Sequence, residues 1–402
     1  MSQTQDSKPL VIKVFLLILL SCILSIAYNK QASASTTTID ASHEGLSPNN
    51  ASNNYQLQRI LDKHMKTDTT IYVPTGTYIF NTGDIVLHSN LHFEFADNAV
   101  FKTQNGNALY FVYPSFNLGY NGGLQNISWQ NATFVGSDIN GQSSITQSFN
   151  HAQNISFNKC KFYNVERPNG HLLDIDGSRN ISVTNSTILG CNLTPNTAYK
   201  EAIQIDYSNY FATSCRINGD KYDNLPSYNI YINNNHFLPI TDSQNHIKFF
   251  APNPIGQHAL YNNGKAGVIH HIFFTNNEVV DPIPRTDPDA STINFMGINS
   301  LFITDNRFVN INTSGASNYI RIVNPIQNYK MSNVIISNNE FLNVKPKRFF
   351  ITLKSNNAYS PISNITISNN QIINFSKVSP FIFSQQNHME QFNNQIIQSM
   401  QQ

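Results

Sequence analysis

A short pattern of apolar and asparagine positions recurs along most of the chain. Apolar residues stand two apart, and a two-residue corner that is most often Asn-Asn separates them from a further apolar residue. Three copies show the same spacing with Asn-Ala, Lys-Cys and Asn-Ser at this corner, namely Asn126–Phe134, Asn154–Phe162 and Asn180–Ile188. Further copies begin at Asn229, His271, Ser300, Asn333 and Asn364. Apolar residues at this spacing indicate a β-strand with one buried face. Asparagine tolerates left-handed backbone, so the pair indicates a sharp turn after each strand.

The spacing of the copies predicts the fold class. Most copies begin about thirty residues after the previous one, which is typical of a solenoid in which each coil rests on the last. A second strand is expected upstream in many coils, at 171–176, 201–206, 246–250, 292–296, 319–323 and 349–354. Short strands without helical periodicity between them predict an all-β, single-stranded parallel β-solenoid with an asparagine ladder at one corner. An antiparallel sandwich with accidental internal similarity is the alternative.

These coils resemble the right-handed parallel β-helix proteins of the pectate-lyase-like superfamily. The segment 70–79, Thr-Ile-Tyr-Val-Pro-Thr-Gly-Thr-Tyr-Ile, is similar to the Val-Pro-x-Gly-Thr-Tyr opening of many secreted and phage members. The resemblance covers about 55–383 and implies the fold. It leaves the activity open, because the superfamily includes lyases, glycosidases, epimerases, tailspikes and adhesins. The apolar face of 55–66 predicts a short helix that caps the first coil.

The composition of the chain argues against nucleic acid and membranes as partners. Asparagine provides 58 of the 402 residues, and 25 Lys and Arg nearly balance 24 Asp and Glu. A chain without a basic excess is poorly suited to nucleic acid, which we exclude as a partner. A hydrophobic share of 40% is too high for a disordered chain. Polar tracts around the apolar runs also argue against membrane insertion beyond the first thirty residues.

The N-terminus predicts the compartment. Lys8 and Lys13 precede and enter the apolar run 14–27, and small residues lead up to Ala34. This order is typical of a secretory signal, so we expect cleavage after Ala34 and a secreted or cell-surface protein. A lipoprotein anchored through Cys22 is the alternative. We expect a flexible lead-in at 35–54, the solenoid at 55–386 and a polar cap or tail at 387–402.

Cysteines do not provide the framework of the mature chain. Cleavage after Ala34 leaves Cys160, Cys191 and Cys215. An odd number leaves at least one free thiol, so disulfides are not expected to hold the fold together.

Strand alternation places acidic side chains together on two neighbouring coils. Four apolar residues are expected to face the interior, namely Leu173, Ile175, Ile203 and Ile205. The polar residues between them then face outward, namely Asp174, Asp176, Gln204 and Asp206. Because coils stack about 4.8 Å apart, we expect Asp176 over Asp206 at about 5 Å, with Asp174 on the diagonal at about 8 Å.

Charged residues are expected further along the same outward column. Extending the alignment adds Lys248, Asn294 and Arg321. Carboxylates this close raise one another's pKa, which keeps one of them protonated at neutral pH. The alternative is that Asp176 and Asp206 cap turns, because each is followed by residues typical of a turn.

Other polar residues border this column. His171 and Glu201 begin their strands at matching positions and are expected to form a second outward pair. The intervals 207–227 and 251–267 break the thirty-residue rhythm and predict long loops that wall a groove, with Tyr207 among the sugar-stacking residues. A tolerated insertion at a corner is the alternative. The histidines at 246, 258, 270 and 271 show no spacing typical of a metal site, and we expect none.

These features favour a secreted enzyme acting on a polysaccharide. In glycosidic hydrolysis, one of Asp174, Asp176 and Asp206 acts as general acid while a second activates water or attacks the sugar, without a cofactor. Glu201, Gln204, His171, Lys248, Arg321 and Tyr207 are the expected substrate-binding residues. The alternatives are a polysaccharide lyase, in which the acids hold Ca²⁺ against a uronate, and a glycan-binding adhesin without catalysis. The polygalacturonase motifs Asn-x-Asp, Asp-Asp, Gly-His-Gly and Arg-x-Lys are not met.

Overall fold

The computed structural model describes residues 36–397, and the solenoid lies in the compact unit Thr38–Gln402. The internal segments outside the description are 137–142, 167–170, 192–200, 262–263, 285–286, 288, 314–315, 328, 345, 347, 356–360, 375–381 and 385–388. The predicted signal segment 1–34 also lies outside the described residues.

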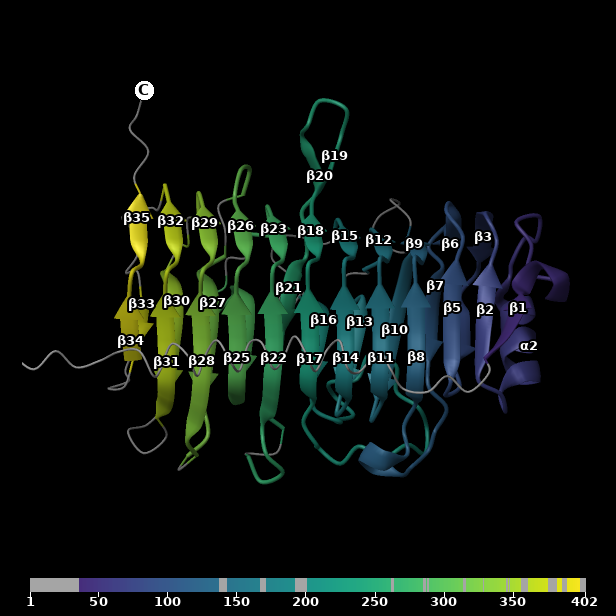
Figure 1. Cartoon of the computed structure of the whole chain (residues 1–402), viewed down its shortest axis with the longest axis horizontal. Helices are drawn as coiled ribbons and strands as arrows, with labels where there is room; N and C mark the ends of the chain where they lie inside the picture. The colour runs from purple at the N-terminus through teal and green to yellow at the C-terminus, as the bar shows by residue number, and fades with distance from the viewer. Residues whose placement is uncertain are drawn as a thin grey trace, which may run out of the picture. The chain divides into compact units, whose positions relative to one another are not determined.

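Three long sheets run along the stack (Figure 1). Sheet A contains β1 (Thr37–Asp40), β2 (Thr69–Val73), β5 (Leu91–Phe95), β8 (Gln125–Gln130), β11 (Gln153–Asn158), β14 (Arg179–Thr184), β17 (Tyr228–Asn233), β22 (Ile269–Thr275), β25 (Ile298–Thr304), β28 (Met331–Ser337), β31 (Ile362–Ser368) and β34 (Met389–Phe392). Sheet B contains β3 (Gly76–Phe80), β6 (Ala99–Thr103), β9 (Thr133–Val135), β12 (Lys161–Tyr163), β15 (Thr187–Leu189), β18 (His236–Leu238), β23 (Glu278–Val280), β26 (Arg307–Val309), β29 (Glu340–Leu342), β32 (Gln371–Ile373) and β35 (Gln395–Ile397).

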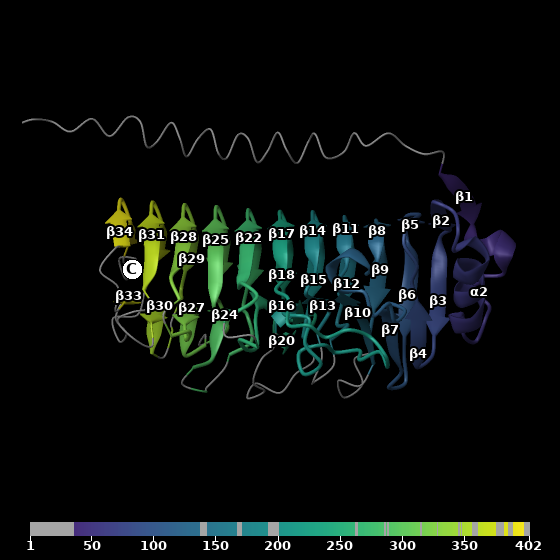
Figure 2. The ribbon, with the colours of Figure 1, turned by 90° about the horizontal axis from the view of Figure 1, so that it is seen from below.

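Sheet C carries five of the six predicted second strands, and Figure 2 shows it on a different side of the stack from sheet A. It contains β4 (Gly83–Val86), β7 (Ala108–Val112), β10 (Ser144–Asn150), β13 (Leu173–Asp176), β16 (Glu201–Asp206), β21 (Asn253–Gly256), β24 (Ser291–Met296), β27 (Asn318–Asn324), β30 (Phe349–Ser355) and β33 (Ile382–Ser384). Successive coils pair in parallel, as β11 does with β14 and β13 with β16. The predicted parallel solenoid is therefore confirmed, and the antiparallel sandwich is excluded.

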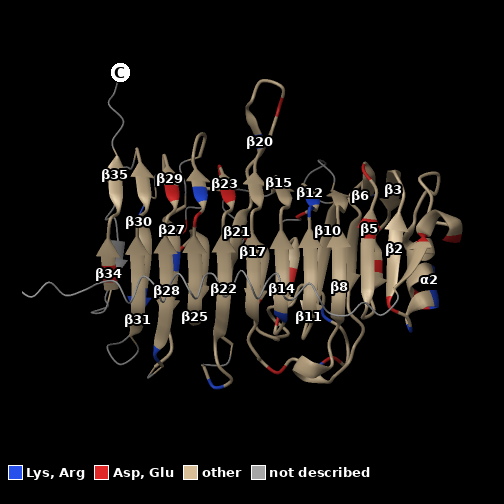
Figure 3. Cartoon of the chain, in the orientation of Figure 1, with Lys and Arg blue, Asp and Glu red and all other residues tan. Residues whose placement is uncertain are grey.

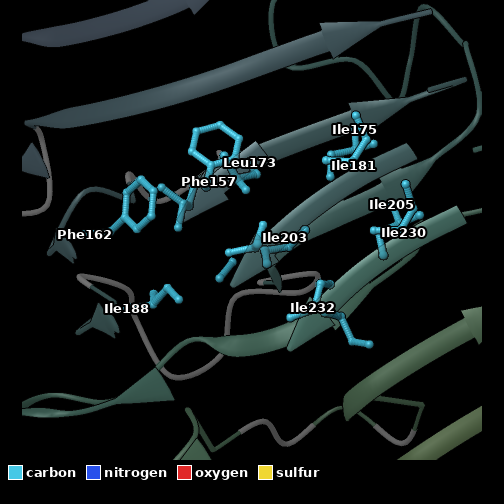
Figure 4. Close-up of a cluster of buried hydrophobic side chains, with 14 of the residues drawn as sticks. Phe157, Phe162, Leu173, Ile175, Ile181, Ile188, Ile203, Ile205, Ile230 and Ile232 are labelled. Atoms are coloured by element: carbon cyan, nitrogen blue, oxygen red, sulfur yellow. The ribbon is translucent and has the colours of Figure 1, made fainter. Parts of the chain in front are cut away.

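The core lies inside the stack and is built by strand alternation. Leu173, Ile175, Ile203 and Ile205 are fully buried in it, as predicted. Figure 4 shows them pointing inward with apolar side chains of the other strands. Because neighbouring coils repeat the same alternation, each apolar residue rests on its equivalent in the next coil, and the pairing register is fixed.

Asparagines build the turn after sheet A, as the repeat predicts. The second asparagine of the pair forms a buried ladder of side-chain hydrogen bonds through Asn235, Asn277, Asn306, Asn339, Asn370 and Asn394. The first residue of the pair has left-handed backbone, with φ of 57° at Asn234 and 55° at Asn276. The first residue of each repeat is also left-handed, which the sequence analysis did not predict; Asn126 has φ of 58°.

Both ends of the solenoid differ from the predicted boundaries. The helix α2 (Asn54–His64) buries Leu57, Ile60 and Leu61, which confirms the capping helix. The segment before it, predicted as a lead-in, contains β1, which joins sheet A next to β2, and the 3-10 helix η1 (Ala41–Glu44). At the other end β34 and β35 extend sheets A and B past residue 386. None of the helices in the described residues is long and apolar enough to cross a membrane.

Three shorter elements lie outside the regular coils. The 3-10 helix η2 (Gly119–Asn121) precedes β8. The strands β19 (Ile240–Thr241) and β20 (Ile247–Phe249) form an antiparallel hairpin that projects beyond sheet B in Figure 1. The prediction that 246–250 forms the second strand of a coil is therefore wrong, because these residues lie in the hairpin and not in sheet C. The coil after β16 is supplied by β21, which pairs Ile255 with Ile203.

Candidate functional site

Two neighbouring strands of sheet C place the predicted acids in register. In the pairing of β13 with β16, Asp176 lies opposite Asp206 and Asp174 lies opposite Gln204. The side chains of Leu173 and Ile203 point into the core, so the side chains of the acids point away from it, on the opposite face of the sheet. The pairing predicted for the acidic residues of these two strands is confirmed. Figure 3 shows Asp, Glu, Lys and Arg scattered thinly along the strands and loops of the solenoid.

The acids are covered rather than open to solvent, which corrects the predicted groove. Asp174, Asp176 and Asp206 each have 0% exposure, although they point away from the core. The loop 207–227 folds back over them: the backbone N–H of Ser214 donates to Asp174, and Gln204 donates to the carbonyl of Ala212 at 3.2 Å. An inserted segment of this length can reach the outer face of its own coil, and here it seals the acids.

The covering loop is tethered to the solenoid by polar contacts. Asn150 donates to the Asp220 carboxylate at 2.7 Å, and His151 pairs with Asp223 at 2.9 Å. Apolar area is left exposed at its tip, where Phe211 is 76% exposed. The loop is therefore both a cover for the acids and an aromatic surface above them.

Burial dominates the electrostatics of the three acids. It raises the pKa of Asp174, although hydrogen bonds from Ser214 and Ser148 oppose the rise. It raises the pKa of Asp206 to about 7, with His258 opposing. The pKa of Asp176 lies well above its usual range because of burial and the neighbouring Asp174 and Asp206 carboxylates. At neutral pH the cluster therefore retains protons that exposed carboxyl groups would have lost.

Turn capping explains these acids poorly. Asp206 does accept from the backbone N–H of Tyr207 at 2.9 Å. Both oxygens of Asp176 are buried without a hydrogen bond of normal geometry from the described residues, and the Thr213 hydroxyl lowers the Asp176 pKa only in part against the rise caused by burial. A buried polar group without such a bond costs free energy, so its retention points to a role other than folding.

A second cluster lies beside the acids and contains His258, which the sequence analysis considered only as a metal ligand and rejected on its spacing. His171 and Glu201 come together as predicted, with His171 Nδ1 2.6 Å from the Glu201 carbonyl oxygen. His258 joins them: its Nε2 lies 3.5 Å from Glu201 Oε2, and its ring centroid is 4.9 Å from that of His171. Burial alone would lower the pKa of His258, but Glu201 and the nearby Asp206 and Asp174 raise it.

Gly256 makes room for this second cluster. It lies opposite Gln204 in the register of β16 with β21. A Cβ at Gly256 would meet Glu201 Cγ at 2.5 Å and Oε1 at 2.7 Å. The absence of a side chain there lets the Glu201 carboxylate lie across β21 toward His258.

Two of the predicted substrate-binding residues are misplaced and one is confirmed in position. Lys248 lies exposed on the hairpin strand β20, so its place in the column is wrong; Gly256 occupies that position. Tyr207 has 0% exposure and offers no surface for a sugar. Arg321 does lie in the column, opposite Asn294, and donates to Asn294 Oδ1 at 2.8 Å.

Comparison with solved structures identifies the architecture. A surface adhesin of Streptococcus pneumoniae, PfbA, superposes with a TM-score of 0.60 at 17% identity over 91% of each chain. The chain is a right-handed parallel β-helix. A tailspike protein of E. coli bacteriophage HK620, in complex with a pentasaccharide, matches the β-helix with a TM-score of 0.50 at 12% identity, over 88% of this chain and 60% of that one. No protein-family model and no curated protein sequence matches.

At these identities the similarity is one of fold, and the activity of the β-helix has to be argued from its own residues. His258 was not placed beside the acids because the hairpin residues 246–250 were aligned with sheet C in place of β21. With β21 aligned, His258 falls two residues after Gly256, as Asp206 falls two residues after Gln204. Aligning β21 rather than 246–250 with the other strands of sheet C would have placed His258 beside the acids.

Proposed function

We propose that this β-helix hydrolyses a glycosidic bond of a polysaccharide at the acid cluster of Asp174, Asp176 and Asp206. The observation that carries the proposal is the arrangement of three buried carboxyl groups on two paired strands, with Asp176 in register with Asp206. Burial in this cluster raises the pKa of Asp206 to about 7. A carboxylic acid that is still protonated near neutral pH can donate its proton to a leaving sugar oxygen.

Both acids accept hydrogen bonds that favour the ionised form: Asp174 from Ser148 Oγ at 3.1 Å and the Ser214 N–H, and Asp206 from the backbone N–H groups of Tyr207 and His258 at 2.9 and 3.2 Å. The assignment of roles therefore rests on Asp206, whose pKa burial still raises to about 7. We assign Asp206 as the general acid and Asp174 as the base that activates water. From the strand spacing they are separated on the diagonal by about 8 Å. This separation is typical of inverting glycosidases, so the product is expected with inverted anomeric configuration.

Access to these acids requires the covering loop to move. Asp174 and Asp206 have 0% exposure, so a sugar reaches them only when the loop 207–227 is displaced. The exposed rings of Tyr210 and Phe211 on that loop are suited to contact the glycan first. Arg321, three coils further along sheet C, is placed to bind another unit of the same chain.

A non-catalytic glycan-binding protein is the second candidate. The full burial of the acids favours it, because binding through the loop surface needs no access to them. The S. pneumoniae adhesin has the same fold, so the fold is compatible with binding alone. A Ca²⁺-assisted lyase is less well supported, since Lys248, one of two expected proton acceptors, lies on the hairpin.

Product analysis on a panel of polysaccharides separates these possibilities. We expect new reducing ends without the ultraviolet absorbance of an unsaturated uronate, whereas a rise in that absorbance would indicate elimination. Asp206→Asn and Asp174→Asn are each expected to lower the rate about 100-fold or more, because each removes a proton-transfer group. Asp62→Asn, on the exposed side of α2, is the matched control and should retain full activity.

Two outcomes would contradict hydrolysis at this site. Glycan binding by the wild type without any new reducing ends would support the adhesin function. Full activity in a normally folded Asp206→Asn variant would place the catalytic acid elsewhere.

A further inference from the structure

Three potential metal ligands from three successive coils meet beside the acid cluster. One ligand atom from each of His171, Glu201 and His258 lies within 4.8 Å of the other two. His171 precedes β13, Glu201 begins β16 and His258 follows β21, so consecutive coils each supply one donor. We propose that these three residues bind a divalent transition-metal cation of the Zn²⁺ class. The site is distinct from the proposed hydrolysis, and testing it requires no glycan.

The donor spacing fits a single small cation. With Zn–N and Zn–O bonds of about 2.0–2.2 Å, two ligands of a tetrahedral site lie about 3.4 Å apart. Glu201 Oε2 and His258 Nε2 are separated by 3.5 Å, which matches that edge. The remaining donor, from His171, is within 4.8 Å of both, so cation binding requires the three donors to draw closer together.

The orientation of His171 is that of a metal ligand. Its Nδ1 lies 2.6 Å from the backbone carbonyl oxygen of Glu201, so this nitrogen carries the proton and donates it to the carbonyl. The lone pair is then on Nε2, which can face a cation. A metal-binding histidine usually donates its other ring N–H to a carbonyl or carboxylate in this way, which fixes the ring.

The backbone is adapted to the carboxylate. Gly256 has no side chain, and a Cβ there would overlap Glu201 Cγ and Oε1 at 2.5 and 2.7 Å. His171 and Glu201 are buried, while the His258 side chain is 22% exposed. The protein therefore encloses one side of the site and leaves a path for a cation past His258.

The donor set selects the class of cation. Two imidazoles and one carboxylate suit Zn²⁺, Co²⁺ and similar ions, whereas Ca²⁺ and Mg²⁺ prefer oxygen ligands alone. Three protein ligands also leave a fourth position for water, as in zinc sites that are not purely structural.

Metal titration of the untagged, EDTA-treated chain tests the proposal. We expect one equivalent of Zn²⁺ or Co²⁺ to bind by calorimetry and metal analysis, and Zn²⁺ to raise the melting temperature by several degrees while Ca²⁺ does not. His258→Ala is expected to weaken Zn²⁺ binding about 100-fold or more, and because His258 is partly exposed this variant should fold normally. His171→Gln should have a similar effect, with folding checked by circular dichroism.

The adjacent pair His270 and His271 provides the matched control. Their Nδ1 atoms lie 2.7 Å apart on sheet A, which makes them the competing histidine pair. The variant with both replaced by Ala should keep stoichiometric Zn²⁺ binding. The proposal is overturned if that variant loses binding, if His258→Ala retains it, or if the wild type binds no metal; in the last case His258 and Glu201 form only an ion pair.

Discussion

Asp176→Asn is expected to stabilise the protein at pH 8 and to leave its stability almost unchanged at pH 4. The side chain has 0% exposure, and no hydrogen bond of normal geometry from the described residues reaches its oxygens. Its charge therefore has little to offset the loss of hydration. Asparagine has nearly the same shape and carries no charge at any pH. We expect a gain of several kcal/mol at pH 8, the cost of an inadequately compensated buried carboxylate.

The pH dependence follows from the direction of the pKa shift. Burial, together with Asp174 and Asp206, raises the pKa of Asp176 well above its model-peptide value of 3.8. Between these two values the folded state holds a proton that the unfolded state has lost. The stability that this proton represents is complete below about pH 4 and is lost as the pH rises. Tyr113 and Tyr222 also face Asp176, but the pKa of each is raised, so both stay neutral across this range.

Thermal and denaturant unfolding of the wild type and of Asp176→Asn at pH 4, 6 and 8 measures the effect. The difference between the two proteins should grow with pH, and Asp62→Asn should show no such trend, because its carboxyl group is exposed. A variant less stable than the wild type at pH 8 would show that the charged form of Asp176 makes contacts that hold the loop 207–227 in place.

The sequence contains the coil geometry almost completely. A one-residue slip would turn Leu173 and Ile203 out of the core, so the apolar alternation determines which residues of adjacent coils are paired. The pairing of Asp176 with Asp206 could be predicted on that basis and is found in the structure. Left-handed backbone at the asparagine corner follows from the same local chemistry, because few other residues tolerate it.

Insertions between the coils are where prediction fails. The loop 207–227 has no repeat to align, so its return over Asp174 and Asp206 could not be anticipated, and neither could their burial. The hairpin of β19 and β20 has the apolar content of a coil strand, and alignment to it displaced β21 from the predicted sheet. When one strand is misaligned, every residue of that coil is assigned to the wrong position. Lys248 was therefore placed in the column, and His258 was not placed beside the acids.

Asn306→Ala is expected to destabilise the stack by about 2–4 kcal/mol. Asn306 has 2% exposure and lies in the middle of the buried asparagine ladder. Its Nδ2 donates to the Phe274 carbonyl at 2.9 Å and to Asn339 Oδ1 at 3.0 Å, and its Oδ1 accepts from the Asn277 backbone N–H at 2.8 Å. Alanine removes these three bonds and a fourth, from Asn277 Nδ2 to Asn306 Oδ1 at 3.2 Å, and leaves the Phe274 carbonyl and the Asn277 N–H of the neighbouring coil buried without these partners. The residue does not have positive φ, so no backbone strain is added.

Asn233→Ala is the control that tests whether the loss of stability is specific to ladder asparagines or common to any asparagine of the solenoid. Asn233 is half-buried at the end of β17 and accepts from Thr275 and Asn276, where water can replace the lost bonds, so its loss should cost less than about 1 kcal/mol. Each coil contacts only its neighbours, so hydrogen exchange in Asn306→Ala should accelerate mainly between the coils of Asn277 and Asn339. Equal destabilisation by the two variants would mean that a ladder asparagine contributes no more to stability than the half-buried Asn233 does, and that apolar stacking alone determines the stability of the solenoid.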